Sequence, residues 1–315
     1  MGICRYCRQG AGWFKDAHAA CLQRANAGTE AVKVCMANCV IEGREYDPAT
    51  VDKIVSDAAI PVDDTRAALI SGWSKGAEQK GKTQPISPDE CNAMCKVLLD
   101  AGFELKEFQW TPGGWAMVFS RLIWAVLHDK LADLPDFPPG VIKFNLQAGE
   151  VPVWSFSMLL KQQCTTTSYV GVYGGPSIRV ASGLYYRFGE VRGHRVQSTS
   201  LQEVDHGDFL LTTRAIYFGG NNRGVSFRLP YDQVIRFQPY SDAVGICKNG
   251  TREQIFVPTN VNTPVGVALA SSADPSRVRF RSDGPRRIIP FPDSGWFLFN
   301  ILQALAAKNS GARVS

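Results

Sequence analysis

The chain has 315 residues, of which 45% are hydrophobic and 20% are charged, and its formal net charge is +5. This balance is typical of a soluble globular protein and excludes a largely disordered chain. The length allows two or three domains with at least one full hydrophobic core. The most apolar run, Trp115–Leu127, is short and contains Arg121, so it predicts a buried helix and no transmembrane segment.

The charge is unevenly distributed along the chain. Residues 1–24 carry four basic residues and one acidic residue, residues 25–137 carry eleven and seventeen, and residues 138–315 carry nineteen and eleven. A basic C-terminal half favours an anionic partner, such as a phosphate group, an acidic protein face or a lipid surface. A solvated surface with a charge bias gives the same counts, so both interpretations stay open.

Four residues near the N-terminus have the spacing of a zinc site. Cys4 and Cys7 form a C-x-x-C pair, and His18 and Cys21 lie three residues apart on a helix that we expect over Asp16–Ala27. Ligands at this helical spacing share a face, so both can bind one ion and complete a tetrahedral set with two thiolates. We expect one structural Zn²⁺. The alternative is free thiols near the chain end.

The order of these ligands, a knuckle followed by a ligand-bearing helix, resembles a small treble-clef or zinc-ribbon module. Cysteine is used elsewhere as well: the total of nine is odd, and no signal peptide precedes the first pair. We therefore expect reduced thiols in a cytoplasmic protein. Two C-x-x-x-C pairs fall on the apolar faces of expected helices, which indicates packing in the core, with a four-thiolate metal site as the alternative. These pairs are Cys35/Cys39 and Cys91/Cys95.

Residues 28–137 are expected to form a helical domain. Apolar residues recur at helical spacing over Val32–Val40. The segments Asp47–Ala59 and Ser87–Leu99 both begin with a capping residue followed by proline, and a further helix is expected over Asp63–Lys80. The two capped segments are either equivalent parts of a duplicated helix pair or two ordinary helices with similar start signals.

The pattern changes after the prolines and glycine of residues 135–150, which break helical structure. From Val151 onward, short β-branched and aromatic runs alternate with turn residues, which predicts an all-β barrel or sandwich. An amphipathic helix over Asp293–Ala307 is expected to close one end. After a first strand from Val151, the expected strands are Ser177–Phe188, Phe209–Phe218, Val225–Pro230, Val234–Tyr240, Val244–Cys247 and Gln254–Val257.

Several blocks in this half resemble bacterial pleckstrin-homology-like and GRAM-like domains. They are Gly149-Glu150 with Trp154, Gly183–Gly189, Asp205–Phe218, Phe227–Ile235 and Pro239–Asp242. The resemblance covers residues 146–307 and implies a partly open β-barrel capped by a C-terminal helix. Such domains bind phosphoinositides, peptides or proteins. The expected fold class is therefore multidomain α+β: a zinc module over residues 1–27, an all-α domain over 28–137 and a barrel over 146–307.

A long insertion is expected over residues 258–292, where the family pattern has a short connection. It carries five arginines: Arg277, Arg279, Arg281, Arg286 and Arg287. The first three alternate, which would place their guanidinium groups on one side of an extended strand and suits phosphate or carboxylate recognition. The alternative is a solvated edge strand that uses charge against aggregation.

The sequence predicts a non-enzymatic bacterial adaptor or recruitment protein. Its barrel would engage a protein partner or an anionic membrane surface at the inner face, with the five arginines as the contact. The alternative is an accessory factor of a stress or phage-defence system that contacts nucleic acid through the zinc module. An enzyme ranks third, because no histidine has a Ser or Cys partner in a known motif. The expected nucleic-acid contacts are Arg5, Arg8, Lys15, Arg24 and exposed Tyr6 and Trp13.

Overall fold

The computed structural model describes residues 2–12, 15–130, 137, 142–173, 177–181, 184–187, 191–262, 267–268, 279–280 and 294–310, with the backbone alone inside 165–199 and 260–294. Its first part consists of β1 (Gly2–Ile3), β2 (Gly10–Gly12), α1 (Ala19–Glu42), α2 (Pro48–Ala58), α3 (Val62–Thr83), α4 (Pro88–Asp100), α5 (Leu105–Phe108) and α6 (Pro112–Leu127). The second part consists of β3 (Pro152–Tyr173), β4 (Ser177–Ala181), β5 (Leu184–Arg187), β6 (Val191–Thr212), β7 (Ala215–Gly220), β8 (Ser226–Pro230), a 3-10 turn η2 (Tyr231–Gln233), β9 (Val234–Pro239), β10 (Val244–Lys248), β11 (Gln254–Asn262), β12 (Val267–Ala268), β13 (Arg279–Phe280) and α7 (Ser294–Asn309).

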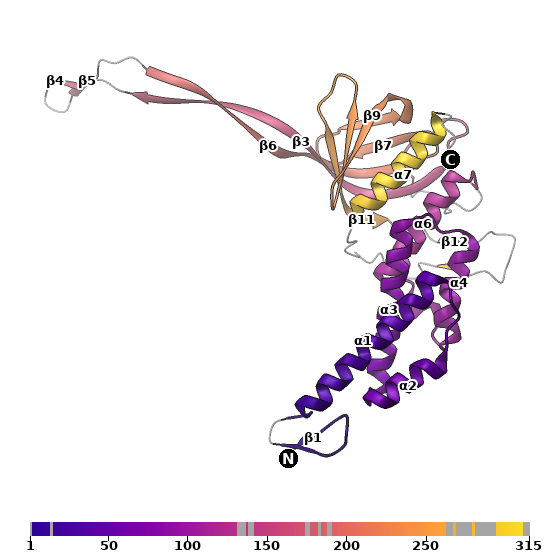
Figure 1. Cartoon of the computed structure of the whole chain (residues 1–315). Helices are drawn as coiled ribbons and strands as arrows, with labels where there is room; N and C mark the ends of the chain where they lie inside the picture. The colour runs from indigo at the N-terminus through magenta and orange to yellow at the C-terminus, as the bar shows by residue number, and fades with distance from the viewer. Residues whose placement is uncertain are drawn as a thin grey trace.

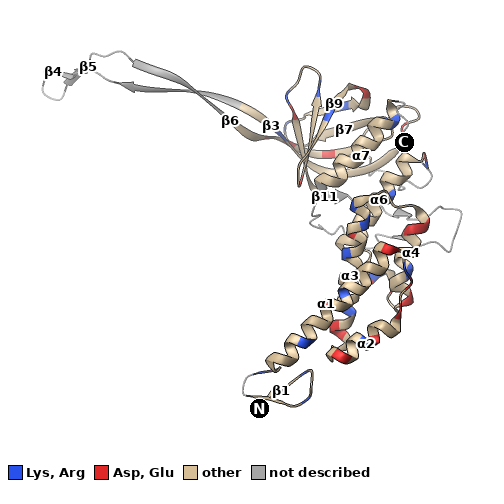
Figure 2. Cartoon of the chain, viewed as in Figure 1, with Lys and Arg blue, Asp and Glu red and all other residues tan. Residues whose placement is uncertain are grey.

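The fold is mixed α and β. Figure 1 shows the helical part at one end, the sheet covered by α7 at the other, and a long two-stranded ribbon that leaves the sheet. Acidic residues are found along the helices, α2 among them (Figure 2). None of the helices that the structure describes is long and apolar enough to cross a membrane.

The start of each predicted capped helix is confirmed. Asp47 accepts a hydrogen bond from the amide of Ala49 at the start of α2. Ser87 and Glu90 form a complete capping box at the start of α4. In both helices proline occupies the first turn, where its missing N–H costs nothing. The expected helix over Asp63–Lys80 is α3, which is longer by a residue before it and three after it.

The expectation of two helices between residues 16 and 40 is wrong. A single helix, α1, begins at Ala19 and continues to Glu42, so it crosses the boundary expected between residues 27 and 28. Gly28 lies inside this helix and serves close packing: a Cβ there would lie 2.3 Å from the Cβ of Ala58 and 3.0 Å from Ile60. The absence of a side chain at Gly28 thus lets the end of α2 pack closely against α1, and α1 continues without a break at this residue.

Helices α1 and α3 pack at very short range. A Cβ at Gly72 would lie 2.4 Å from the carbonyl oxygen of Lys33, and one at Gly76 would lie 2.7 Å from that of Ala37. Two glycines four residues apart therefore form a smooth stripe on α3, along which the backbone of α1 lies directly. The same close approach buries Trp73, whose Nε1 donates to the carbonyl of Met94 at 2.7 Å.

One hydrophobic core continues from the helices into the sheet. Helix α6 is buried on almost every side, as its apolar composition predicted, and the buried Arg121 lies with its guanidinium 4.6 Å from the ring centre of Trp124. Phe119 of α6 stacks on Phe297 of α7 with ring centres 3.8 Å apart, and its ring centre lies 5.3 Å from that of Trp154 on β3. Aromatic side chains thus join the helices, α7 and the sheet.

The sheet is antiparallel throughout, in the order β8-β7-β6-β3-β11-β10-β9. Strands β8 and β9 stand at opposite ends of this order, yet only η2 connects them. Four Cα steps span at most about 15 Å, whereas the outer strands of a flat seven-stranded sheet lie about 29 Å apart. The sheet is therefore strongly curled, and α7 packs beside β9, β10 and η2.

Two expected strands differ from the structure. The run Phe209–Phe218 is a tight hairpin, because Thr212 Oγ1 accepts from the amides of Arg214 and Ala215 and donates to the carbonyl of Ala215. The run Ser177–Phe188 is also a hairpin, formed by β4 and β5, which pair only with each other. In the first run the polar residues Thr212, Thr213 and Arg214 mark the turn, and the expected single strand passed over them.

The remaining strand predictions are confirmed as β8, β9, β10 and β11. Strand β11 continues to Asn262, so the expected insertion begins inside a strand. Of the insertion's later residues, β12 and β13 pair with each other, with Val267 opposite Phe280 and Ala268 opposite Arg279.

Candidate metal centre

The two N-terminal cysteines lie on a tight knuckle within the β1–β2 hairpin. The amide of Cys4 donates to the carbonyl of Gln9 at 2.7 Å, and the amide of Arg8 donates to the carbonyl of Cys4 at 2.9 Å. Arg8 has a φ of 61°, a left-handed conformation that turns the chain after Cys7. These bonds hold both thiols on the same side of the loop.

The histidine and the third cysteine come from the beginning of α1. His18 does not lie inside the helix as expected; it is the residue before the first turn, with extended φ and ψ of −76° and 145°. Its carbonyl accepts from the amide of Leu22 at 2.9 Å and so starts the helix. Cys21 lies in the first turn, and the three-residue spacing still brings both side chains to one point.

The four side chains converge as a tetrahedral site requires. The ligand atoms of Cys4, Cys7, His18 and Cys21 all lie within 4.8 Å of one another. Nδ1 of His18 is 3.4 Å from Sγ of Cys7 and 3.8 Å from Sγ of Cys21. Zinc bond lengths of about 2.3 Å to sulfur and 2.0–2.1 Å to nitrogen give tetrahedral edges of about 3.5 Å between these atoms. The residues therefore fit a zinc ion.

The orientation of the imidazole is fixed by a second contact. Nε2 of His18 lies 2.9 Å from the carbonyl oxygen of Gly10, which can only accept, so Nε2 carries the proton. The lone pair of Nδ1 then points to the three sulfur atoms. This is the support that metal-binding histidines receive in proteins, where the other ring nitrogen donates to a carbonyl or carboxylate.

The thiols have unequal proton affinities. Burial raises the pKa of Cys4, but the amides of Cys7, His18 and Tyr6 stabilise its thiolate by more, so the pKa is lowered to about 6. Burial, with the neighbouring thiols of Cys7 and Cys4, raises the pKa of Cys21. The cluster thus stabilises the thiolate of Cys4 by itself, and a divalent cation would supply the charge that lets Cys21 ionise.

The knuckle packs against the helical part. Cys4, Tyr6 and Ala11 form a small core with Ala25 of α1, and Arg5 forms an ion pair with Asp64 of α3 at 3.5 Å. The expectation of an exposed Tyr6 is wrong: 8% of the residue is accessible, and the guanidinium of Arg5 lies 4.7 Å from its ring centre. Trp13, the other aromatic residue expected to contact nucleic acid, lies outside the described residues.

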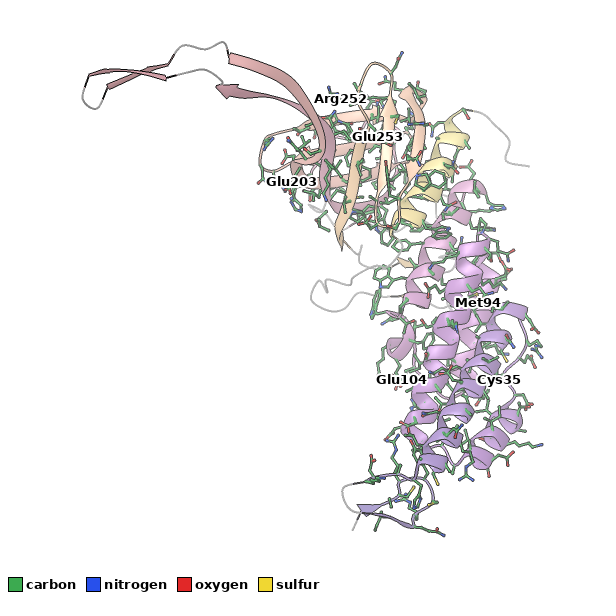
Figure 3. All side chains as sticks on the ribbon, turned by 60° about the vertical axis from the view of Figure 1, so that its left-hand side comes forward. Cys35, Met94, Glu104, Glu203, Arg252 and Glu253 are labelled. Carbon is green, nitrogen blue, oxygen red and sulfur yellow. The ribbon has the colours of Figure 1, made fainter. Side chains whose placement is uncertain are left out.

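The other helical cysteines pack in the hydrophobic core. Cys91 and Cys95 are fully buried, and Cys39 is 8% exposed. Figure 3 labels Cys35 and Met94 within the helical part. Among the residues that the structure describes, the N-terminal set is the single group of three or more ligand side chains close enough to hold an ion. The core-packing interpretation of the two C-x-x-x-C pairs is thereby favoured over a four-thiolate site.

The arginine-rich contact stays a prediction. Arg277, Arg281, Arg286 and Arg287 lie outside the described residues, and Arg279 is described by its backbone in β13 alone.

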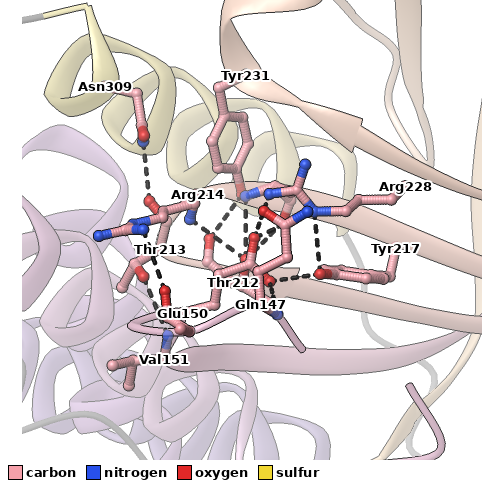
Figure 4. A network of polar contacts seen from close by, with 12 residues as sticks. Gln147, Glu150, Val151, Thr212, Thr213, Arg214, Tyr217, Arg228, Tyr231 and Asn309 are labelled. Atoms are coloured by element: carbon pink, nitrogen blue, oxygen red, sulfur yellow. Dashed lines mark hydrogen bonds and ion pairs between the residues drawn. The ribbon is translucent and has the colours of Figure 1, made fainter. Parts of the chain in front are cut away.

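A buried polar network was not predicted from the sequence (Figure 4). Glu150 is buried and accepts from Tyr217 Oη, from both Nε and Nη2 of Arg228, and from the amide of Gln147. Arg228 Nε also donates to Tyr217 Oη at 3.0 Å. Burial alone would raise the pKa of Glu150, but Tyr217 and Arg228 lower it. In the sequence, the Gly149-Glu150 block was the only indication that Glu150 matters, and it did not indicate which side chains bind the carboxylate.

The same network connects the segment before β3, and the C-terminal helix α7, to the β6–β7 turn. The backbone of Val151 pairs with Thr213, whose carbonyl accepts from Asn309 of α7 at 2.8 Å. Tyr231 donates to the carbonyl of Thr212 at 2.9 Å. Thr212, Thr213 and Tyr231 belong to the sequence blocks that resemble pleckstrin-homology-like domains, and here they have a structural role. No protein-family model matches the chain, and no curated protein gives a significant match.

Proposed function

We propose that this chain is a non-enzymatic adaptor protein whose curled sheet binds a protein partner through the β3–β6 ribbon. The N-terminal centre supports a structural role for its ion, because four protein ligands fill a tetrahedral shell and leave no position for a substrate. In this proposal a Zn²⁺ ion at Cys4, Cys7, His18 and Cys21 is structural and fastens the knuckle to α1.

The ribbon is the observation that carries the proposal. Strand β11 pairs with β3 only as far as Gln162, and β7 pairs with β6 only from Gly207 onward. From Gln163 opposite Leu201 to Tyr173 opposite Val191, the described parts of β3 and β6 pair with each other and with no third strand. At about 3.3 Å per residue, these eleven positions extend about 35 Å from the sheet (Figure 1).

Such a ribbon is an unusual element for an isolated chain. A two-stranded hairpin alone is marginally stable in water, and its outer edges present rows of unpaired main-chain N–H and C=O groups. Both properties suit a partner that adds a strand to the edge or lies across the ribbon. A protein partner uses these groups fully, whereas a lipid surface does not.

The pleckstrin-homology-like interpretation of the sheet belongs to the same proposal. Its support is the strong curl that η2 requires and the C-terminal helix packed beside β9 and β10. Because related architectures bind many kinds of partner, this resemblance does not choose one. A cytoplasmic location, contact with the inner membrane face, and separate helical and barrel units over residues 28–137 and 146–307 belong to the same proposal, although α1 joins the zinc module of residues 1–27 to the helical unit without a break.

Nucleic-acid binding by the zinc module has less support. Tyr6 is packed inside the small core and Arg5 is paired with Asp64, so two of its expected contacts are already engaged.

The proposal is tested by excising the ribbon. Cys164 and Ser200 lie opposite each other, and the main-chain groups of even-numbered β3 residues face β6, so residues 165–199 can be replaced by the two-residue turn Asn-Gly. Thermal unfolding shows whether the shortened chain retains its fold. Both chains are then cross-linked in the native host and the attached proteins are identified. We expect a partner that the full chain captures and the ribbonless chain does not.

Two results would count against this function. The same proteins on both chains would show that the ribbon does not bind the partner. Salt-sensitive sedimentation of the full chain with phosphatidylserine vesicles, and not with phosphatidylcholine vesicles, would assign the C-terminal half to an anionic membrane instead.

A further inference from the structure

Resting on the proposed function, we propose that the outer edge of β3, residues 164–173, pairs in antiparallel fashion with the same edge of a second copy of the chain. The ribbon would then be a four-stranded dimer contact, with β3 strands in the centre and β6 strands outside.

The main-chain groups that face this edge follow from two contacts. The carbonyl of Ser157 accepts from Thr259 Oγ1 at 3.0 Å, and the carbonyl of Gln163 accepts from Arg252 Nη1 at 3.1 Å. Both donors come from the β11 side of β3, so odd-numbered residues of β3 point their N–H and C=O groups away from β6. Figure 3 labels Arg252 near the base of the ribbon.

This alternation continues along the ribbon, because the register between β3 and β6 is regular from Lys161 to Tyr173. Main-chain groups are therefore presented at the outer edge by Thr165, Thr167, Tyr169, Gly171 and Tyr173. Arg252 donates to the carbonyl of Gln163, which is the last outward-facing carbonyl before these residues. Within the described part of the chain, nothing pairs with the edge beyond it. Five such residues on each of two strands allow about ten interstrand hydrogen bonds.

The sequence of the edge distinguishes β3 from β6. Residues 164–173 of β3 contain no charged residue and no proline, and most are Thr, Val or Tyr, which favour strands. Natural edge strands that avoid pairing carry charges or proline. The facing stretch of β6 has this protection, since Arg192, His194 and Arg195 lie within it. Of the two open edges, β3 is the one suited to pairing.

Self-pairing also explains why the assembly would stop at two chains. A strand that pairs antiparallel with its own copy is related to it by a two-fold axis, so the contact is closed. The outer edges of the resulting ribbon are both β6, whose basic residues repel a further β6 edge. An uncharged edge beside a basic edge thus gives a dimer and not a fibre.

Proline substitution tests the edge directly, with a matched control on the other strand. Thr167 lies opposite Gln197 in a pair whose main-chain groups both point away from the partner strand. Thr167→Pro removes an N–H from the outer edge of β3, and Gln197→Pro removes one from the outer edge of β6. Neither change removes a bond between β3 and β6. Sedimentation equilibrium of the purified full chains then gives the dissociation constants.

We expect wild type and Gln197→Pro to dimerise equally, and Thr167→Pro to raise the dissociation constant at least about tenfold. A monomeric wild type throughout the micromolar range would overturn the inference. So would a Thr167→Pro chain that dimerises normally, or an equal loss in both variants. If either proline variant fails to fold, Thr167→Lys and Gln197→Lys make the same comparison, because an edge lysine also opposes pairing.

The outcomes separate this inference from the adaptor function. A monomeric wild type whose ribbon still captures a different protein in the host would overturn self-pairing and leave the adaptor proposal standing. A monomeric wild type that binds a DNA duplex with steep salt dependence, lost in Arg192→Gln with Arg195→Gln, would assign the ribbon to nucleic acid and overturn both.

Discussion

Arg228 on β8 donates a hydrogen bond from Nε to a carboxylate oxygen of Glu150 at 3.2 Å, although the two residues lie 78 positions apart in the chain. Glu150 precedes β3, so this pair joins the segment that leads into the sheet to one of its outer strands. The side chain of Glu150 is fully buried, and that of Arg228 is 25% exposed.

Removing the carboxylate should therefore destabilise the sheet. Glu150→Ala leaves Arg228 and Tyr217 without their acceptor, and we expect the free energy of unfolding to fall by about 3 kcal/mol. Urea unfolding measures this value. The control is Lys143→Ala, which removes an ion pair with Asp208 in which the lysine side chain is 68% exposed, and should change stability by less than about 0.5 kcal/mol. Equal effects of the two changes would contradict this assignment.

Zinc should copurify with the chain in a ratio of one ion per chain. Metal analysis of Cys7→Ser should show loss of the ion, whereas Cys164→Ser, which changes a cysteine remote from the cluster, should retain it. Removal of the ion with a chelator should make the first 20 residues sensitive to proteolysis while the helical core unfolds at nearly the same temperature. A zinc content unaffected by Cys7→Ser would refute the assigned ligands.

The stability of the β7–β8 turn should depend on pH through Asp205. This buried carboxylate accepts from the amides of His206, Asn222, Arg223 and Val225. Burial alone would raise its pKa, but these amides outweigh it and lower the pKa below its ordinary value of 3.8. Because the pKa is lower in the folded chain than in the unfolded chain, the ionised carboxylate stabilises the fold at pH values above 3.8. This stabilisation is lost as the pH falls through the lower pKa of the folded chain.

Asp205→Asn should therefore unfold at lower urea concentration than wild type at pH 7. The difference should begin to shrink below about pH 4, where the carboxylate takes up a proton in the unfolded wild-type chain, and should go on shrinking as the pH falls through the lower pKa of the folded chain. The exposed Asp232, changed to Asn, provides the comparison and should behave as wild type at both pH values. A difference that stays constant down to pH 2 would show that the carboxylate charge is unimportant.

The buried cysteines should behave as apolar core residues. Cys95→Ser places a hydroxyl in a fully buried site, and we expect a loss of about 2 kcal/mol in unfolding free energy with no loss of zinc. Cys164→Ser, at a partly exposed position, should cost much less. Loss of a metal ion from the Cys95→Ser chain would instead revive the four-thiolate site.

Local signals in the sequence predicted the starts of α2 and α4 and the convergence of the four candidate metal ligands. A cap such as Asp47, a capping box such as Ser87 with Glu90, and a C-x-x-C pair each depend on a few neighbouring residues. The convergence of His18 with Cys7 follows from such short spacings too. Physical chemistry over one or two turns of chain suffices for these features.

Features set by distant contacts could not be predicted. The continuity of α1 through Gly28 depends on Ala58, thirty residues away. The partner of Glu150 depends on the strand order, because only the sheet brings Arg228 beside it. The length of the ribbon depends on the register of two strands whose sequences look like several shorter runs.

The ribbon also determines how the molecule moves through solvent. A compact chain of 315 residues has a radius of gyration of about 20 Å. The part of the ribbon that no third strand joins adds about 35 Å in one direction (Figure 1). It contributes little mass but much hydrodynamic drag. A monomer with this outline tumbles slowly and leaves a gel-filtration column early, at the volume of a considerably heavier sphere.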